Sequence, residues 1–475
     1  MPSRDEPLWQ RILWRLTPRS ENSARRKLLS GHLDLSSDSV PDVQMLTEWI
    51  DACLAEDGGQ IASRARADTL RRSYRRLNAT GRVRFLVLLM ERYSTDPVVI
   101  EKATKAWQDS GPEQRPLAEL ALRDALEPPR LKLLAQLNSV PEGPKLLIDM
   151  RVDVIALLSE LPELKPLEAD LKRLLTAWFD VGLLRMEQIS WEHSSAALLE
   201  KLIAYEAVHP VHGWDDLKNR LRADRRCYAL FHPSMPTDPL IFVQVALTKG
   251  LADNVQDILD EASPVVPVET ADTAIFYAIS NAQRGLGGIH FGNYLIKSVV
   301  AELQNALPHV KQFSTLSPIP GFHHWLDRQP RERWVPEHCS EEVWRALHTA
   351  PDAAAKELRS LSAIERRDLL GVVARYLVEE KRGSTLRARD PVAHFHLANG
   401  AIVERLNWLG DTSPRGLAQS CGVMVNYLYA VKKLEQRSRD YGHHAEVPMS
   451  LHVRRLIKES NSIPRNATPD SIAGQ

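Results

Sequence analysis

Residues 274–322 constrain the fold more than any other part of this chain. They begin with an apolar run rich in β-forming residues, 274–280, which leads into a glycine-rich turn over 283–292. A helical pattern of apolar residues follows, and then a short second strand over 313–316 runs into a rigid loop that opens with Ser317. This order predicts a strand, a glycine loop, a helix and a strand, with a serine-bearing loop at the end.

The glycines between the strand and the helix fit the approach of an anion. A backbone without Cβ atoms can turn tightly, and the free N–H groups of a first helical turn point at a bound anion. The spacing is not that of a lysine-bearing nucleotide loop, and the acid needed downstream for a dinucleotide fold is missing. An acyl-CoA pyrophosphate is a third anion that fits. A tight turn without a ligand is the alternative, and the glycines alone leave both open.

Length and composition limit the class of protein. The 475 residues suggest two or three domains, and the balance of 61 basic and 61 acidic residues gives no support for nucleic acid or an anionic membrane as the main partner. No apolar run is long enough to span a bilayer. Four scattered cysteines without metal-type spacing predict reduced thiols and no metal site. They are Cys53, Cys227, Cys339 and Cys421.

The chain divides into regions of different character. We predict an N-terminal arm or linker over 1–40, a helical domain over 41–182, a mixed α/β domain over 183–458 and a disordered tail over 459–475. Residues 7–16 are amphipathic and favour a docking helix over a targeting peptide, because acids precede them. Two strands, 226–232 and 240–247, predict an antiparallel hairpin beside the βαβ unit. A helical insertion is predicted over about 341–381.

A second dense stretch, 390–401, carries two histidines and a strong turn signal at its end. We predict a strand here, which would place His394 and His396 on the same face. Their spacing alone does not decide which of them takes part in chemistry, and a buried core histidine is the plainer interpretation. His209 and His212 are interpreted as turn and core residues.

Several separate stretches resemble one family, the malonyl-CoA decarboxylases. The resemblance covers about residues 182–429. The stretches that carry it are His209-Pro210-Val211, Phe276-Tyr277 with the glycine loop, Leu316-Ser317-Pro318-Ile319-Pro320-Gly321-Phe322, Phe395-His396-Leu397 with Asn399-Gly400-Ala401, and Asn426-Tyr427-Leu428-Tyr429. The serine-proline loop and the second histidine stretch are specific. The glycine loop alone is not.

The resemblance implies a two-domain enzyme. Its N-terminal all-α bundle would serve a homo-oligomer, a dimer or tetramer, and its C-terminal mixed α/β domain would have the acetyltransferase-like (GNAT) fold. The implied reaction converts malonyl-CoA to acetyl-CoA and CO2 without metal or added cofactor, CoA being part of the substrate. The resemblance assigns catalysis to Ser317 and His396. It assigns CoA binding to Gly287, Gly288, Ile289, His290, Phe291, Gly292 and Asn293.

Two departures from the family pattern matter. His290 stands where some eukaryotic relatives carry an acid, so an acidic role is not assumed there. The C-terminal residues are not a peroxisomal signal, which favours a bacterial, cytoplasmic member.

The implied residues suit the chemistry. Loss of CO2 from a malonyl thioester leaves an enolate, which needs stabilisation and a proton. A histidine that titrates near neutral pH can supply the proton, and a serine hydroxyl can orient the carboxylate or the histidine. Pro318 and Pro320 restrict the loop around Ser317, and Tyr429 adds a hydroxyl. The alternatives are an acyl-CoA N-acyltransferase of the same fold and a non-catalytic scaffold that binds CoA.

Overall fold

A computed structural model describes residues 40–55, 59–179, 181–289, 292–330, 339–349, 351–383, 385, 387–444 and 446–459. The amphipathic segment 7–16, most of the predicted arm and the tail from 460 lie outside these residues, as do His290 and Phe291. None of the described helices combines the length and the apolar character that crossing a membrane requires.

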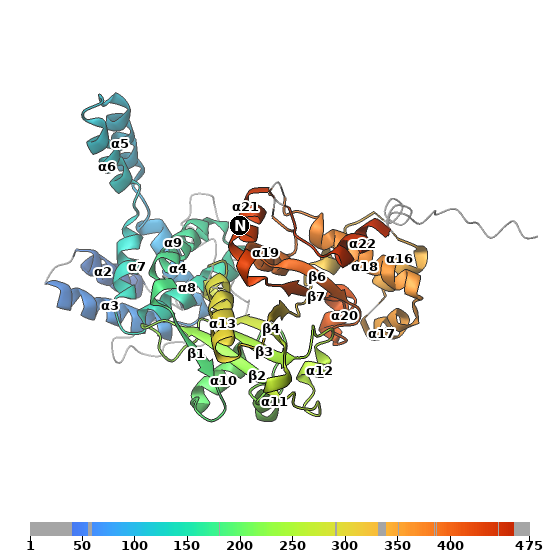
Figure 1. Ribbon diagram of the computed structural model, residues 1–475. Helices are drawn as coiled ribbons and strands as arrows, with labels where there is room; N and C mark the ends of the chain where they lie inside the picture. The colour runs from blue at the N-terminus through green and yellow to red at the C-terminus, as the bar shows by residue number, and fades with distance from the viewer. Residues whose placement is uncertain are drawn as a thin grey trace, which may run out of the picture. The chain divides into compact units, whose positions relative to one another are not determined.

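The first region is helical, as predicted (Figure 1). Several of its helices have a proline in their first turn. Backbone N–H groups in a first turn have no partner within the helix, so a residue without an N–H fits well at that position. Leucines make up more than half of the residues in its buried apolar core, among them Leu86, Leu134 and Leu171. The helices are α2 Val40–Leu54, α3 Gly59–Arg76, α4 Ala79–Arg92, α5 Pro97–Asp109, α6 Arg115–Ala125, α7 Pro129–Asn138, α8 Gly143–Leu157 and α9 Lys165–Trp178.

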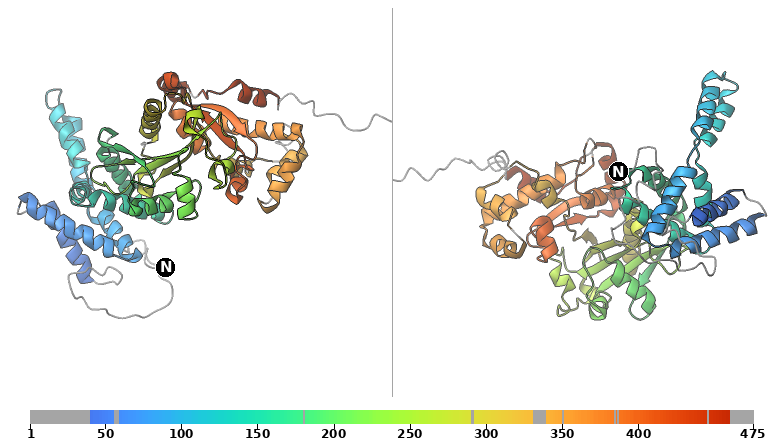
Figure 2. Two further views of the ribbon diagram at one scale, coloured as in Figure 1. Left: turned by 60° about the horizontal axis from the view of Figure 1, so that its bottom comes forward. Right: turned by 180° about the vertical axis from the view of Figure 1, so that it is seen from behind.

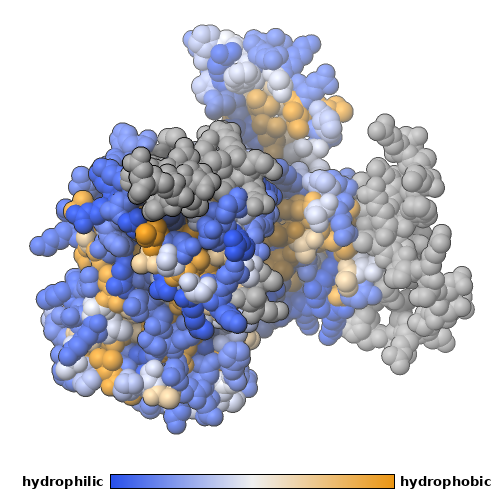
Figure 3. Space-filling view, turned by 90° about the vertical axis from the view of Figure 1, so that its right-hand side faces the viewer, coloured by the Kyte–Doolittle hydropathy of each residue, from blue (hydrophilic) through white to orange (hydrophobic). Residues whose placement is uncertain are grey.

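Helices α5 and α6 form a hairpin that buries none of its own residues. Figure 1 shows it projecting from the other helices of this region, and Figure 3 shows apolar side chains along it at the top of the view. These exposed side chains are Val98, Val99, Leu117 and Leu120, with Leu126 just after α6. Helices with a strongly apolar face usually bury it against another element. This apolar face of the hairpin is therefore uncovered within the described chain.

The second region is built on a seven-stranded sheet with the order β1-β2-β3-β4-β5-β7-β6. The predicted hairpin is present, since β2 pairs with β3 in antiparallel fashion. The predicted βαβ unit is present too, because β4 and β5 are parallel and α13 connects them. The strands are β1 Arg185–Ile189, β2 Arg225–Phe231, β3 Ile241–Thr248, β4 Thr273–Asn281, β5 Gln312–Thr315, β6 Ile402–Asn407 and β7 Met424–Leu428.

The sheet opens between β4 and β5 at the serine loop. Their pairing ends at Phe276 and Thr315, and the last bond between them runs from the Leu316 N–H to the Phe276 carbonyl. Ser317, the next residue, exchanges both backbone hydrogen bonds with Val425 of β7 instead. Parallel strands that separate at their carboxyl ends leave space between them. The sheet thus places Ser317 at the point where β4 and β5 part.

Helices cover both faces of the sheet. Figures 1 and 2 show α13 on one face and α10, α11 and α12 on the other. The face with α12 is apolar, and Ile258 of α12 packs with Ile275, Tyr277 and Leu316. The helices are α10 Ala196–Tyr205, α11 Trp214–Asn219, α12 Gln256–Leu259, α13 Gly292–Ala306, α14 Phe322–Leu326, α19 Pro391–Ala398, α20 Pro414–Ser420, α21 Leu434–His444 and α22 Leu451–Glu459.

The stretch predicted to be a helical insertion contains the helices α16 Glu341–Leu347, α17 Pro351–Ser360 and α18 Ala363–Val378. Ser362 and Glu365 form a capping box that fixes the start of α18. Within the second region, α18 packs against α22 and α17 packs against α20.

The strand predicted around the two histidines is wrong, because residues 391–398 form helix α19. Asp390 caps this helix, and its carboxylate accepts hydrogen bonds from the Val392 and Ala393 N–H groups, both at 2.9 Å. Pro391 follows at the first helical position, which is typical of a helix start. His394 and His396 are therefore two residues apart on a helix and do not share a face.

The two compact units of the structure are not contiguous in sequence. One contains the N-terminal helices together with residues Phe231–Leu240 and Gln283–His290, and the other contains the rest of the chain. Part of the predicted CoA loop thus belongs to the helical unit, although the loop lies far from that unit in sequence.

Candidate active site

Three buried side chains form a hydrogen-bonded chain in the α/β unit. The Nε2 atom of His396 lies 3.1 Å from the Ser317 hydroxyl, and its Nδ1 atom lies 2.7 Å from the Tyr429 hydroxyl. All three residues are at most 6% exposed. The structure therefore brings together the three catalytic-site candidates, which come from the loop after β5, from α19 and from the end of β7.

The direction of each hydrogen bond depends on which ring nitrogen of His396 carries the proton. Burial raises the pKa of the Tyr429 phenol well above the usual value, so the hydroxyl keeps its proton, and we assign the tautomer in which it donates to Nδ1 of His396. His396 then carries its proton on Nε2 and donates it to the Ser317 oxygen. The Ser317 hydroxyl is left to donate to the Thr315 hydroxyl, 2.9 Å away. Thr315 in turn accepts from the Tyr427 N–H.

His396 is an uncharged imidazole in this state. Burial lowers its pKa to about 3, which differs from the near-neutral titration expected from its residue type. Its ring stacks on that of Tyr427, with 4.6 Å between the centroids and 27° between the planes. Stacking on one side and hydrogen bonds at both nitrogens fix the orientation of the imidazole.

Thr315 and Asn426 support this site, and sequence reasoning gave neither of them a role. Asn426 donates to the Thr315 carbonyl at 2.7 Å, which ties β7 to the end of β5. Thr315 and Ser317 are two residues apart on an extended segment, so their side chains share a face. This two-residue alternation can be read from the sequence, so the expected strand before Ser317 could have identified Thr315 as its neighbour on the same face.

The serine loop is tied to the start of α19 by Asp390. Its carboxylate accepts from the Gly321 N–H at 3.2 Å and caps α19 through its other oxygen. A Cβ atom on Gly321 would lie 2.3 Å from the Tyr376 hydroxyl, so only glycine fits there. One buried aspartate therefore sets the position of the loop that carries Ser317 relative to the helix that carries His396.

The other histidines lie apart from this chain of hydrogen bonds. His394 faces Tyr441, with 3.0 Å between Nδ1 and the hydroxyl, and does not contact Ser317. His209 is buried in a turn, as interpreted, and burial lowers its pKa to about 4. The turn is held by Glu206, whose carboxylate accepts from the Val208 and His209 N–H groups.

The described part of the glycine loop rests on α8 and α9 of the helical unit. Gly285 packs so closely on α8 that an added Cβ would lie 2.1 Å from the Ile148 carbonyl. The guanidinium of Arg151 donates to the carbonyls of Gly285 and Gly287 at 2.6 and 2.9 Å. Glu168 of α9 pairs with this buried arginine at 2.7 Å.

The other described residues that were predicted to bind CoA follow Gly287 in the chain. Gly288 has a φ of +76°, a conformation that favours glycine, and the Lys172 ammonium lies 3.3 Å from where its Cβ would be. Ile289 is buried, and Gly292 and Asn293 open α13. A cation beside a glycine-rich loop is a favourable arrangement for an anion.

Comparison with protein families gives one consistent result. Residues 182–467 match the model of the malonyl-CoA decarboxylase C-terminal domain, and residues 93–179 match that of the malonyl-CoA decarboxylase N-terminal domain. The chain belongs to the malonyl-CoA decarboxylase family. The resemblance predicted from the separate sequence stretches is thereby confirmed.

Individual relatives of the family agree. A protein of Anser anser anser described as mitochondrial malonyl-CoA decarboxylase is 39% identical over 351 residues, which is 68% of each chain. Crystal structures of malonyl-CoA decarboxylase from Rhodopseudomonas palustris and Agrobacterium vitis are both 38% identical and cover 87% of this chain and 99% of their own. Their TM-scores are 0.78 and 0.77. The predicted fold class is confirmed as a helical region followed by a mixed α/β domain, and the acetyltransferase-like form of that domain stays a prediction.

Proposed function

We propose that this chain decarboxylates malonyl-CoA with Ser317 and His396 as its catalytic pair. Membership of the family makes it a carboxy-lyase. The observation that supports the pair is the series of hydrogen bonds between buried side chains that runs from Tyr429 through His396 to Ser317. In such a water-poor site, fixed donors act strongly on a developing charge.

In the first step the malonyl carboxylate binds beside His396 while the imidazole is uncharged. Burial keeps His396 neutral in the free enzyme, and an adjacent carboxylate anion favours its protonation. Ser317, hydrogen-bonded to His396, orients the carboxylate or the imidazole. The bond between the carboxylate carbon and C2 then breaks, its electron pair passes into the thioester as an enolate, and CO2 leaves.

In the second step the enolate takes up a proton. The imidazolium of His396 gives its Nε2 proton to C2, which yields the acetyl thioester and returns the ring to its neutral form. While His396 is an imidazolium, its Nδ1 is protonated as well and donates to the Tyr429 oxygen, so this hydrogen bond reverses its direction and still holds the ring in place. One proton is consumed in each turnover, and solvent supplies it when the next substrate binds. This scheme uses neither a metal nor an added cofactor, and that independence stays a prediction, as does a cytoplasmic location.

The decisive assay incubates the purified protein with malonyl-CoA alone and follows acetyl-CoA and CO2 together. Equal amounts of both products support the proposal. Acyl transfer that requires an added amine would instead indicate an N-acyltransferase, and CoA binding without any product would indicate a scaffold.

The glycine loop is proposed to bind the CoA pyrophosphate, because its residues lead into the first turn of α13. We expect Gly292→Val to weaken CoA binding, since a side chain would occupy the approach of the anion, while the fold is largely kept. Calorimetry with CoA measures the effect. The control is Gly111→Val, because an added Cβ at Gly111 meets no atom within 4 Å. Unchanged CoA affinity in folded Gly292→Val protein would make the loop a structural turn only.

The helical domain is proposed to build a homo-oligomer, a dimer or tetramer. The uncovered apolar face of the α5–α6 hairpin supports this, because burial of such a face between copies removes it from water. We expect light scattering to report a dimer or tetramer at micromolar concentration. Changing Val98 and Leu117 together to Asp should lower the measured mass, whereas Ile364→Asp, at an exposed site on α18, should not. A wild-type monomer would contradict the prediction.

A further inference from the structure

The series of hydrogen bonds at the candidate active site has a fourth member, Thr315. Its hydroxyl lies 2.9 Å from that of Ser317 and also accepts a hydrogen bond from the Tyr427 N–H at 3.1 Å. The described part of the chain offers this hydroxyl no other partner. Because Thr315 has no exposed surface, bulk water is not a partner either. The Thr315 proton therefore pairs with the Ser317 oxygen or with nothing.

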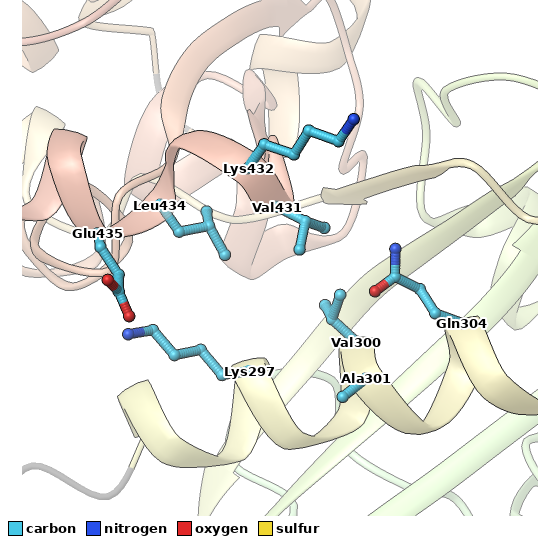
Figure 4. A pocket seen from close by; sticks show the side chains of 8 residues that line it. All are labelled: Lys297, Val300, Ala301, Gln304, Val431, Lys432, Leu434 and Glu435. Carbon is cyan, nitrogen blue, oxygen red and sulfur yellow. The ribbon is translucent and has the colours of Figure 1, made fainter.

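The two ends of this series differ in their surroundings. Tyr429, at one end, lies two residues before Val431, which lines a groove together with α13 (Figure 4). Thr315, at the other end, lies on β5 inside the sheet and is fully buried. The Thr315 end is thus the closed end of the series. Its hydrogen bonds can be rearranged only among the groups that are already there.

The proposed reaction changes the protonation of His396 on the side that faces Ser317. Before the reaction, Nε2 of His396 carries a proton and donates it to the Ser317 oxygen, 3.1 Å away. After Nε2 has given its proton to C2, the ring keeps a proton on Nδ1, so Nε2 becomes an acceptor. Ser317 must then donate where it accepted before. It has one proton, so it can do this only by releasing its hydrogen bond to Thr315.

The Thr315 hydroxyl fits both arrangements without any movement of heavier atoms. In the first, Ser317 accepts from His396 and donates to Thr315. In the second, Thr315 donates to Ser317, and Ser317 donates to Nε2 of His396. A hydroxyl can take both parts because it has one proton and two lone pairs, of which one stays with the Tyr427 N–H. Only the two hydroxyl protons turn.

We propose that Thr315 is a positioning residue of the decarboxylation. It holds the Ser317 proton away from Nε2 of His396 before the reaction, and it donates to Ser317 afterwards. The inference rests on the proposed Ser317–His396 pair and extends it to a residue that acts through Ser317. Without the Thr315 hydroxyl, the Ser317 proton has only Nε2 as an acceptor, which favours the tautomer with the ring proton on Nδ1. In that tautomer Nε2 has no proton to give to C2.

The first test removes the hydroxyl and then restores it. We expect Thr315→Val to lower kcat about tenfold with little change in KM, because the shape is kept while Ser317 loses its partner. Thr315→Ser, which brings the hydroxyl back, should recover most of the wild-type kcat. The matched control is Thr273→Val, at an equally buried threonine on β4 whose hydroxyl bonds to Asp272 and Gln312. Its kcat should equal that of the wild type.

Thr315→Val also leaves the buried Tyr427 N–H without an acceptor, and thermal unfolding measures that cost. If this variant does not fold, Thr315→Cys takes its place. Its sulfur can accept from the Tyr427 N–H but is only a weak partner for Ser317, so kcat should fall in the same direction.

The second test observes the tautomer of His396 and needs no activity. Nitrogen-15 NMR of protein with labelled histidine rings separates protonated from unprotonated ring nitrogens, and the His396 signals are those missing from His396→Asn. We expect Nε2 to be protonated in the wild type, and the Nδ1-protonated form to gain in Thr315→Val but not in Thr315→Ser or Thr273→Val. A role of Thr315 in stability alone would not change the tautomer.

Two results would overturn the inference. In one, folded Thr315→Val protein has the same His396 tautomer as the wild type. In the other, Thr315→Ser loses as much kcat as Thr315→Val, which would make the packing of the threonine methyl group the cause. Failure of the proposed function is a separate result, because wild-type protein would then form no acetyl-CoA from malonyl-CoA while the NMR comparison still reports on Thr315.

Discussion

His396→Asn is expected to lower kcat by at least about a hundredfold, the scale typical of a lost general acid. Asparagine cannot carry a proton between carbon and solvent, and it leaves the hydroxyls of Ser317 and Tyr429 without their shared partner. The affinity for malonyl-CoA should change much less, because the proposed binding of the CoA portion at the glycine loop does not involve His396. Steady-state kinetics and calorimetry on the same preparation separate the two quantities.

The matched control for this change is His394→Asn. His394 lies on the same helix two residues earlier, but its ring faces Tyr441 and does not contact Ser317. Its substitution should leave kcat within a few fold of the wild type. Retained turnover in His396→Asn would remove that residue from the mechanism. Loss of binding together with turnover would make it a structural residue.

Ser317→Ala is expected to cost about as much in kcat as the histidine change, if its hydroxyl orients the carboxylate or the imidazole. Its oxygen is the acceptor for Nε2 of His396. Alanine removes this acceptor, and only Tyr427 and Tyr429 are then left to hold the ring. The double variant should be little worse than the more damaged single variant, because groups that act as one unit are not additive.

Ser314→Ala provides the comparison for this serine. Ser314 is equally buried on β5, but its hydroxyl donates to the Tyr427 carbonyl and does not contact His396. Any loss of kcat in Ser314→Ala should therefore be small, and thermal unfolding would show whether its fold is kept. Independent, multiplying losses in the Ser317–His396 double variant would contradict a shared unit.

The elements that sequence predicted best are those with a local signal. The βαβ unit, the β2–β3 hairpin and the helical region all follow from periodicity and from glycine and proline positions. The error at α19 is also local. Asp390 and Pro391 are a cap and a first helical residue, and this start signal was outweighed by the apolar, β-forming character of the residues that follow.

The parts of the site that local patterns do not specify depend on contacts distant in sequence. His396 was selected by family resemblance alone, and its stacking on Tyr427 comes from a strand about thirty residues away. The close approach of Gly285 to the Ile148 carbonyl joins residues more than a hundred positions apart. No pattern within one segment specifies such pairs, because packing in three dimensions decides them.

The arginine that holds the glycine loop has a practical consequence for work with shortened proteins. Arg151 fixes the carbonyls of Gly285 and Gly287, and it lies in a helix that a fragment starting at residue 183 would lack. The chain also enters the helical unit twice more, at Phe231–Leu240 and Gln283–His290, so a single cut does not release either compact unit intact. Variants in α8 and α9 should accordingly be assayed for substrate affinity as well as for assembly, since damage there reaches the loop through two hydrogen bonds.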